Sequence, residues 1–206
     1  MIDALERAAG RPVSRETADL LETYVERLKS ANSTQNLVAA STLGAIWQRH
    51  ILDGAQLVRF EPHPDASWVD IGSGAGLPGM VVAALVEGPV ALVEPRRLRA
   101  AFLEETAAAL GLADRVSVRA SKIEHVHGSF DVITARAVAP LTRLLAMAHH
   151  LAHSETIWAL PKGKSADSEL AEANRSWQCE ARREASCTDP QATILVLSKV
   201  KAKSKR

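Results

Sequence analysis

A run of glycines in residues 68–79 constrains the fold more than any other feature of the chain. The segment reads Trp-Val-Asp-Ile-Gly-Ser-Gly-Ala-Gly-Leu-Pro-Gly, a short apolar stretch followed by glycines at positions 72, 74, 76 and 79. Glycine loses more backbone entropy on folding than other residues, so this cluster indicates positive φ angles or close approach of a ligand to the backbone. An apolar run typical of a helix follows from Met80 to Leu85. A strand, a glycine turn and a helix in this order predict a loop that holds a nucleotide-like cofactor.

Short apolar stretches alternate with helical segments beyond residue 66. We predict strands at 68–71, 90–93, 116–119, 130–134 and 156–160, and helices at 78–87, 96–110, 121–126 and 137–151. This alternation is typical of a doubly wound α/β fold, in which right-handed crossovers join parallel strands. A polar helix around 166–174 and two closing strands, 177–184 and 193–197, follow. The short connection between these two strands predicts an antiparallel strand at the edge of the sheet.

The first 60 residues have a different pattern. Residues 14–31 carry apolar side chains at three- and four-residue spacing, as do residues 41–59, and each pattern predicts a helix. Two prolines in Glu61–Asp65 end the second pattern. We therefore expect a single domain of 206 residues, with a helical N-terminal extension (1–60), a Rossmann-like core (66–198) and a basic tail (199–206).

Composition excludes several classes of protein. Hydrophobic residues make up 47% of the chain, but no run of 18 apolar residues that could span a membrane occurs. The N-terminus is charged and lacks the apolar centre of a signal peptide. Two cysteines, Cys179 and Cys187, have the spacing of neither a metal site nor a disulfide framework. We expect a cytoplasmic protein with no metal and no membrane partner.

Basic side chains are concentrated at the C-terminus. Residues 199–206 hold five basic and no acidic side chains, whereas the rest of the chain holds 20 basic against 24 acidic ones. A mildly acidic body with a basic end indicates a polyanion that is contacted locally, with Lys199 and Lys201 among the candidate contacts. The alternative is a disordered end that contributes only solubility.

The glycine run fits two cofactors in two registers. Gly74–Gly79 matches the dinucleotide pattern, whereas Gly72–Gly76 with Asp70 ahead matches the S-adenosylmethionine (AdoMet) pattern. A carboxylate repels a pyrophosphate, but it attracts the cationic amino acid end of AdoMet. Glu94 ends the second strand, where an acid accepts hydrogen bonds from ribose hydroxyls in both cofactor classes. The three arginines after it, at 96, 97 and 99, would suit the 2′-phosphate of NADP or form a solvated helical turn.

Further motifs resemble one family. They are Asn36-Leu37, Arg49-His-Ile-Leu-Asp53, the run from Asp70 through Gly79, Phe130-Asp131, Ala135-Arg-Ala137 and Lys162-Gly163. In this order they resemble the bacterial small-subunit ribosomal RNA guanine-N7 methyltransferases, the methyltransferase G family. The resemblance implies the class I AdoMet-dependent methyltransferase fold, with seven strands of which the last is antiparallel. It also implies AdoMet as cofactor, S-adenosylhomocysteine as product, and a guanosine in the 530-loop region of 16S rRNA as substrate; we expect a monomer.

The resemblance assigns cofactor contacts to Gly72, Leu77, Ile123, Glu124 and Arg136. With the residues derived above, the predicted cofactor site also contains Asp70, Gly74, Gly76 and Glu94. Predicted RNA contacts are Arg136, Lys162, Arg49, Lys199 and Lys201. His50 and Asp53, next to Arg49, can share one helix face, which indicates either a capping or packing network or an RNA surface. Two positions depart from the family: Glu94 stands where many relatives have Asp, and Pro161 precedes Lys162.

Methylation at N7 of guanine needs no general base, because N7 carries a lone pair and no proton at neutral pH. We therefore predict no catalytic acid or base, and expect orientation of the reactants to supply up to about 7–11 kcal/mol. Two other functions stay open. A nicotinamide-dependent oxidoreductase lacks a hydride-site pair, since Tyr24, the one tyrosine, lies in the N-terminal helix. A catalytically silent RNA-binding module is the second alternative.

Overall fold

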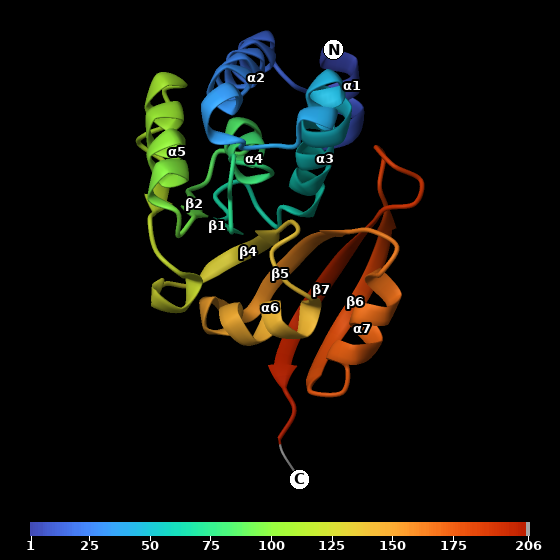
Figure 1. The fold of residues 1–206 in the computed structure, drawn as a ribbon. Helices are drawn as coiled ribbons and strands as arrows, with labels where there is room; N and C mark the ends of the chain where they lie inside the picture. Colours follow the sequence, from blue (N-terminus) through green and yellow to red (C-terminus); the bar gives the residue numbers. More distant parts are fainter. Residues whose placement is uncertain (205–206) are drawn as a thin grey trace.

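The fold is a seven-stranded sheet with helices on both faces, as a computed structural model of residues 1–204 shows (Figure 1). The strand order is β3-β2-β1-β4-β5-β7-β6. The strands are β1 (Trp68–Ile71), β2 (Val90–Val93), β3 (Val116–Arg119), β4 (Phe130–Ala135), β5 (Ala152–Lys162), β6 (Trp177–Ala185) and β7 (Thr193–Ala202). Neighbours among β1 to β5 are parallel, whereas β7 is antiparallel to both β5 and β6. This confirms the seven-stranded class I architecture with an antiparallel last strand, which lies one position inside the edge strand β6.

Helices connect the strands and cover the sheet. The α-helices are α1 (Ile2–Ala9), α2 (Arg15–Gln35), α3 (Leu52–Ala55), α4 (Gly79–Leu85), α5 (Arg97–Ala109), α6 (Leu141–Ala148) and α7 (Ala166–Ala173). The 3-10 helices are η1 (Ala40–Ala45), η3 (Gln56–Phe60), η4 (Ile123–His125) and η5 (His149–Leu151), and η2 (Trp47–Ile51) is a π-helix. No helix within residues 1–204 is long and apolar enough to cross a membrane.

Successive side chains of a strand point to opposite faces of the sheet, so the core consists of two layers. Trp68 of β1 and Leu92 of β2 are buried in one cluster with α1 to α5, whereas Val69 and Val93 are buried in the other with α6 and α7. Figure 1 shows this division, with the N-terminal helices on one side of the sheet and α6 and α7 on the other. The N-terminal extension therefore shares its core with the sheet.

The structure corrects several predicted elements. Residues 41–59 form η1, η2, α3 and η3 in place of one continuous helix, and Gly44 and Gly54, both poor helix formers, lie within this segment. Helix α1 was not expected, because its eight residues are too short for a clear period. The predicted helix 121–126 is the three-residue turn η4, and the predicted helix 137–151 contains only α6 and η5.

Strand lengths near the C-terminus also differ from the prediction. β5 begins at Ala152, four residues before the predicted start, and β7 continues to Ala202, five residues beyond the predicted end. Residues 199–202 of the predicted tail therefore belong to β7, and Lys201 and Ala202 pair with Gln178 and Trp177 of β6. Lys205 and Arg206 of that tail lie outside the described residues.

Candidate functional site

The glycine loop lies at the carboxyl edge of the sheet, where ligands bind in α/β proteins. β1 ends at Ile71, and Gly72 follows at once with a φ of 67°. Gly74 and Gly76 also have positive φ, at 57° and 93°. Residues with a side chain rarely adopt this conformation, so the backbone leaves β1 along a path that favours glycine.

Asp70 joins the end of β1 to the start of α4. Its Oδ2 accepts a hydrogen bond of 3.1 Å from the backbone N–H of Gly79, while Oδ1 is buried without a hydrogen-bond partner. A Cβ on Gly79 would lie 2.6 Å from Asp70 Oδ2, so glycine is required for this close approach. Burial raises the pKa of Asp70 to about 7. A cation bound close to this carboxyl would therefore stabilise its ionised form at neutral pH.

Glu94 faces the same loop from β2. Its Oε2 accepts from the backbone N–H of Gly74 at 2.9 Å, and its Oε1 accepts from the backbone N–H of Arg96 at 2.8 Å. The side chain is buried at 4% exposure. A carboxylate has about four lone-pair sites, so two remain for the hydroxyls of a ribose.

Tyr24 of α2 contacts the glycine loop from the side of the N-terminal helices, a role that the sequence did not indicate. Its hydroxyl donates to the carbonyl oxygen of Ala75 at 2.8 Å, and the side chain is fully buried. A Cβ on Gly76 would lie 3.0 Å from this hydroxyl. The two residues in the hydrogen bond are 51 positions apart, so no local pattern could have indicated it.

Val138, which follows β4, lies directly over Gly72 of the loop. A Cβ on Gly72 would lie 2.7 Å from Val138 Cγ2. The preceding Ala137 has a φ of 56°, uncommon for a residue with a side chain. This strained connection after β4 places an apolar side chain directly over Gly72.

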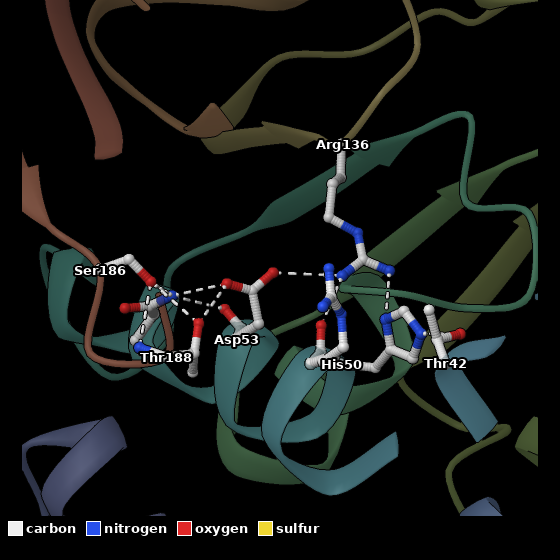
Figure 2. A network of polar contacts seen from close by, with 8 residues as sticks. Thr42, His50, Asp53, Arg136, Ser186 and Thr188 are labelled. Atoms are coloured by element: carbon white, nitrogen blue, oxygen red, sulfur yellow. Dashed lines mark hydrogen bonds and ion pairs between the residues drawn. The ribbon is translucent and has the colours of Figure 1, made fainter. Parts of the chain in front are cut away.

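Arg136 is held by the segment that contains the Arg-His-Ile-Leu-Asp motif (Figure 2). Its Nη1 donates to Asp53 Oδ2 at 3.1 Å and to the carbonyl oxygen of Arg49 at 3.3 Å, and its Nη2 donates to His50 Nδ1 at 3.1 Å. These three bonds leave two of the five guanidinium N–H groups for a ligand. The structure thus brings Arg49, His50 and Asp53 together with Arg136, at the end of β4.

His50 is neutral in this arrangement. Burial, together with the Arg136 guanidinium, lowers the pKa of His50 to about 4. Since arginine is only a donor, His50 Nδ1 must accept, and Nε2–H therefore donates to Thr42 Oγ1 at 2.9 Å. The imidazole thus positions the guanidinium without adding a charge.

Asp53 extends the network to the turn between β6 and β7. Its Oδ1 accepts from Gln56 Nε2 at 2.9 Å and from Thr188 Oγ1 at 3.1 Å. Gln56 in turn accepts from the backbone N–H of Cys187. Figure 2 shows Asp53 between Arg136 on one side and Ser186 and Thr188 on the other.

A cavity of about 570 Å³ opens beside Arg136, over the ends of β4 and β5. Arg49, Arg136 and Lys162 bring positive charge to its lining, and Asp53, Glu169 and Asp189 bring negative charge. Lys162 Nζ forms an ion pair with Glu169 Oε2 at 2.8 Å, and it donates to the carbonyl oxygen of Ala139 at 3.4 Å. Val138 lines the cavity as well, so the cavity adjoins the glycine loop.

Four predicted site residues lie elsewhere. Ile123 is buried against α6 and Glu124 is exposed, both in η4 beyond β3. Lys199 forms an ion pair with Glu180, and Lys201 is exposed. On β7, Thr193 pairs with Lys162 at the carboxyl end of β5, so Lys199 and Lys201 lie about 20–26 Å further along the strand. The structure does not bring these two lysines to the cavity.

The comparisons with known proteins identify the family. Residues 17–194 match the family described as rRNA small subunit methyltransferase G. The chain belongs to this family. It is 48% identical over 196 residues to the ribosomal RNA small subunit methyltransferase G of Rhizorhabdus wittichii, covering 94% of this chain and 90% of that protein. It is 42% identical over 203 residues to the protein of the same name from Zymomonas mobilis, covering 94% of this chain and 91% of that one.

Solved structures agree on the fold. A TehB-like SAM-dependent methyltransferase from Corynebacterium glutamicum superposes with a TM-score of 0.57 at 14% identity, covering 86% of this chain and 97% of that one. The expected class I fold is thereby confirmed. The family and the fold both agree with AdoMet as the cofactor. The glycine loop at Gly72–Gly76 fits this molecule, with Glu94 beside it and, within residues 1–204, the unpartnered Oδ1 of Asp70.

Proposed function

We propose that this methyltransferase transfers a methyl group from AdoMet to N7 of a guanosine in the 530-loop region of 16S rRNA, within the small ribosomal subunit. The observation that carries the proposal is the junction of two sites. Val138 both covers Gly72 of the cofactor loop and lines the cavity beside Arg136. A methyl donor on the loop and an acceptor base in the cavity would therefore meet at this side chain.

The cofactor side consists of backbone and two acids. The loop from Gly72 to Gly76, next to Leu77, holds the methionyl and ribosyl parts of AdoMet, with the most room at Gly74, and Glu94 accepts from the ribose hydroxyls. Ionised Asp70 stabilises the amino group. Ile123 and Glu124, in η4 after β3, stay predicted cofactor contacts, to which no described contact with the loop adds support. AdoMet supplies a methyl group on a positively charged sulfur.

The guanosine side must leave N7 free. Arginine commonly binds guanine through O6 and N7 together, but an arginine on N7 would block the reaction. The two free N–H groups of Arg136 therefore donate to O6 or to the phosphate, and Arg49 and Lys162 hold the neighbouring phosphates. The volume of the cavity, about 570 Å³, lies in the range of small-molecule sites.

Charge balance in the cavity suits a base that becomes positive. Arg136 is paired with Asp53 at 3.1 Å and Lys162 with Glu169 at 2.8 Å, and the lining holds three basic side chains, Arg49 among them, against three acidic ones. A cavity with a large positive charge would oppose the developing charge on guanine, whereas this one does not. Because no proton leaves N7, the protein's contribution is orientation of the lone pair toward the methyl group.

The test is methyl transfer to a mapped nucleotide. Small ribosomal subunits from cells without this protein are incubated with it and radiolabelled AdoMet, and 7-methylguanosine is then mapped in the rRNA. The proposal requires label at one guanosine of the 530-loop region, in a protein-dependent manner. Binding of NADPH without binding of AdoMet, or subunits that stay unmodified, would contradict it.

A further inference from the structure

A second groove lies away from the cavity, between the end of α2 and the start of α5. It has a volume of about 410 Å³ and is lined by Thr34, Gln35, Arg96, Arg97, Leu98 and Arg99. Figure 1 shows α2 and α5 neighbouring each other on the same face of the sheet, and the two helices are in contact. Leu98 is 74% exposed, more than any other large hydrophobic side chain within residues 1–204. Arg96 and Arg97 beside it are also exposed.

The arginines of this groove have no structural partner. Within residues 1–204, none of the three guanidinium groups at 96, 97 and 99 forms an ion pair, and the first turn of α5 contains no acidic residue. Cations at the start of a helix oppose its dipole and destabilise it. The amide of Gln35 also lines the groove, and its Oε1 has no hydrogen-bond partner. The groove therefore offers unused arginine donors that helix stability does not explain, beside a buried acceptor.

The groove is continuous with the cofactor loop. A Cβ on Gly74 would lie 3.8 Å from Arg99 Nη1, and Glu94 bonds to the backbone N–H of both Gly74 and Arg96. The cavity for the guanosine lies on the other side of this loop, over β4 and β5. Since β2 is separated from β4 and β5 by two to three strand spacings, groove and cavity are about 10–15 Å apart along the sheet edge. A short single-stranded segment of RNA would reach both.

We propose that this groove binds the phosphate backbone of the rRNA strand next to the target guanosine, with Leu98 against an adjoining base or sugar. The inference rests on the proposed function. Arginines that form no ion pair with an acidic side chain are available to neutralise phosphates in an RNA interface. An exposed apolar side chain among them can contact the nonpolar face of an unstacked base in a single strand. AdoMet carries no phosphate, and its single carboxylate does not supply an anionic partner for all three arginines.

The experiment compares charge-removing variants in RNA binding. The double variant Arg96→Gln/Arg97→Gln and the wild-type protein are titrated with a fluorescently labelled 530-loop RNA fragment at several KCl concentrations. In single-stranded nucleic acids each phosphate contact contributes about 0.7 to the slope of log affinity against log salt. Loss of two contacts should therefore reduce the magnitude of this slope by about 1.4. The KM for RNA should rise, with the AdoMet affinity and kcat unchanged. Leu98→Ser should weaken binding several-fold without changing the salt slope.

The matched control is Arg7→Gln/Arg15→Gln, which removes two exposed arginines from α1 and the first residue of α2. The 21-residue helix α2 places Arg15 about 30 Å from the groove, so this variant should keep the wild-type slope. An unchanged slope in Arg96→Gln/Arg97→Gln, at normal melting temperature, would overturn the proposal. So would a selective loss of AdoMet affinity, or NADPH binding that depends on these arginines. If the wild-type protein methylates rRNA and the slope stays unchanged, the groove alone is refuted, whereas absence of methylation by the wild type refutes the proposed function.

Discussion

Gly72 combines two constraints in a single residue, a φ of 67° and a neighbour directly above its Cα. The change Gly72→Ala should destabilise the protein by about 1–2 kcal/mol, because a side chain in the left-handed region is strained. The new Cβ would also lie 2.7 Å from Val138 Cγ2, within the space over the loop. We expect AdoMet affinity to fall at least about tenfold, equivalent to 1.4 kcal/mol. Isothermal titration calorimetry and urea unfolding measure the two effects.

Two further variants separate the causes of this loss. In the Val138→Ala background the clash is relieved, so Gly72→Ala should cost less stability there, but AdoMet affinity should stay low. Gly44→Ala is the matched control, because a Cβ at Gly44 has open space around it and no positive φ. Unchanged AdoMet affinity in Gly72→Ala would show that the cofactor does not lie on this loop.

Asp70 gives the stability of the protein a pH dependence of its own. An unfolded chain holds the proton of an aspartic acid only below a pH of about 3.9, whereas burial raises the pKa of Asp70 to about 7 in the folded protein. Between these values the folded state binds more protons, so the free energy of unfolding falls as the pH rises from about 4 to 7, and levels off above. The loss is on the order of a few kcal/mol.

The variant Asp70→Asn isolates this effect, since asparagine does not ionise. Urea unfolding of both proteins between about pH 5 and pH 8 should show the wild type losing stability relative to Asp70→Asn as the pH rises. His50 acts with the opposite sign, because its lowered pKa of about 4 removes stability as the pH falls below about 6.5, but this contribution cancels in the comparison. A difference between the two proteins that is constant with pH would contradict the account of Asp70.

At the scale of elements, Asp53 links three separate segments. It bonds to Arg136 after β4, to Gln56 of η3 and to Thr188 in the turn before β7. The side chains of Asp53 and Arg136 are only 15% and 22% exposed. Asp53→Asn should therefore destabilise the protein by about 1–3 kcal/mol, since it leaves a mostly buried guanidinium without its counter-ion.

A double-mutant cycle with Arg136→Met tests this link, with unfolding free energies as the readout. We expect a coupling energy of about 1 kcal/mol or more between the two residues. The exposed pair of Arg175 and Glu172, with 78% and 56% of the side chains accessible, is the matched control and should show less than about 1 kcal/mol. Equal coupling in both cycles would mean that Asp53 does not hold Arg136 in place.

Elements with strong local signals were predicted closely. β1, β2 and β3 have the predicted bounds, because they are short, apolar and bordered by glycine, proline or charged residues. Helix α2 begins where Ser14 caps it, by accepting from the backbone N–H of Thr17 at 3.1 Å. The ends of β5 and β7 were predicted poorly, because residues such as Ala152 and Lys201 become part of strands through pairing with distant partners. Local pattern carries no information on such pairing.

The site divides in the same way. The glycine loop and Glu94 were recognisable, since both lie directly at strand ends that the sequence marks. His50 and Asp53 were expected on one helix face, but their shared partner Arg136 is 86 and 83 positions away. Tyr24 was known only as part of a helix, and its bond to Ala75 depends on how α2 packs on the sheet. Contacts between distant segments require the fold before they can be seen.

Across the whole molecule, one of the two core layers joins the N-terminal helices to the sheet beneath the cofactor loop. Leu21 and Tyr24 of α2 are buried in the same cluster as Trp68 of β1 and Leu103 of α5. Neither the helical extension nor the sheet covers its apolar face alone, so we expect residues 1–60 and the remainder to unfold together. Far-UV circular dichroism and tryptophan fluorescence should give coincident urea transitions, and a ligand that binds the folded state should move both by the same amount.

Single-tryptophan variants sharpen this test, because the chain has tryptophans in both layers of the core. Trp47 lies in the N-terminal extension, Trp68 in the first core cluster and Trp158 in the second. Each variant that keeps one of these tryptophans should have the same midpoint by fluorescence as by circular dichroism of that variant. An earlier transition at Trp47 alone would show that the extension is a separate unit. In that case the hydrogen bond from Tyr24 to the loop would break before the sheet unfolds. AdoMet would then also raise the unfolding midpoint of the extension, because AdoMet binding depends on the loop that Tyr24 supports.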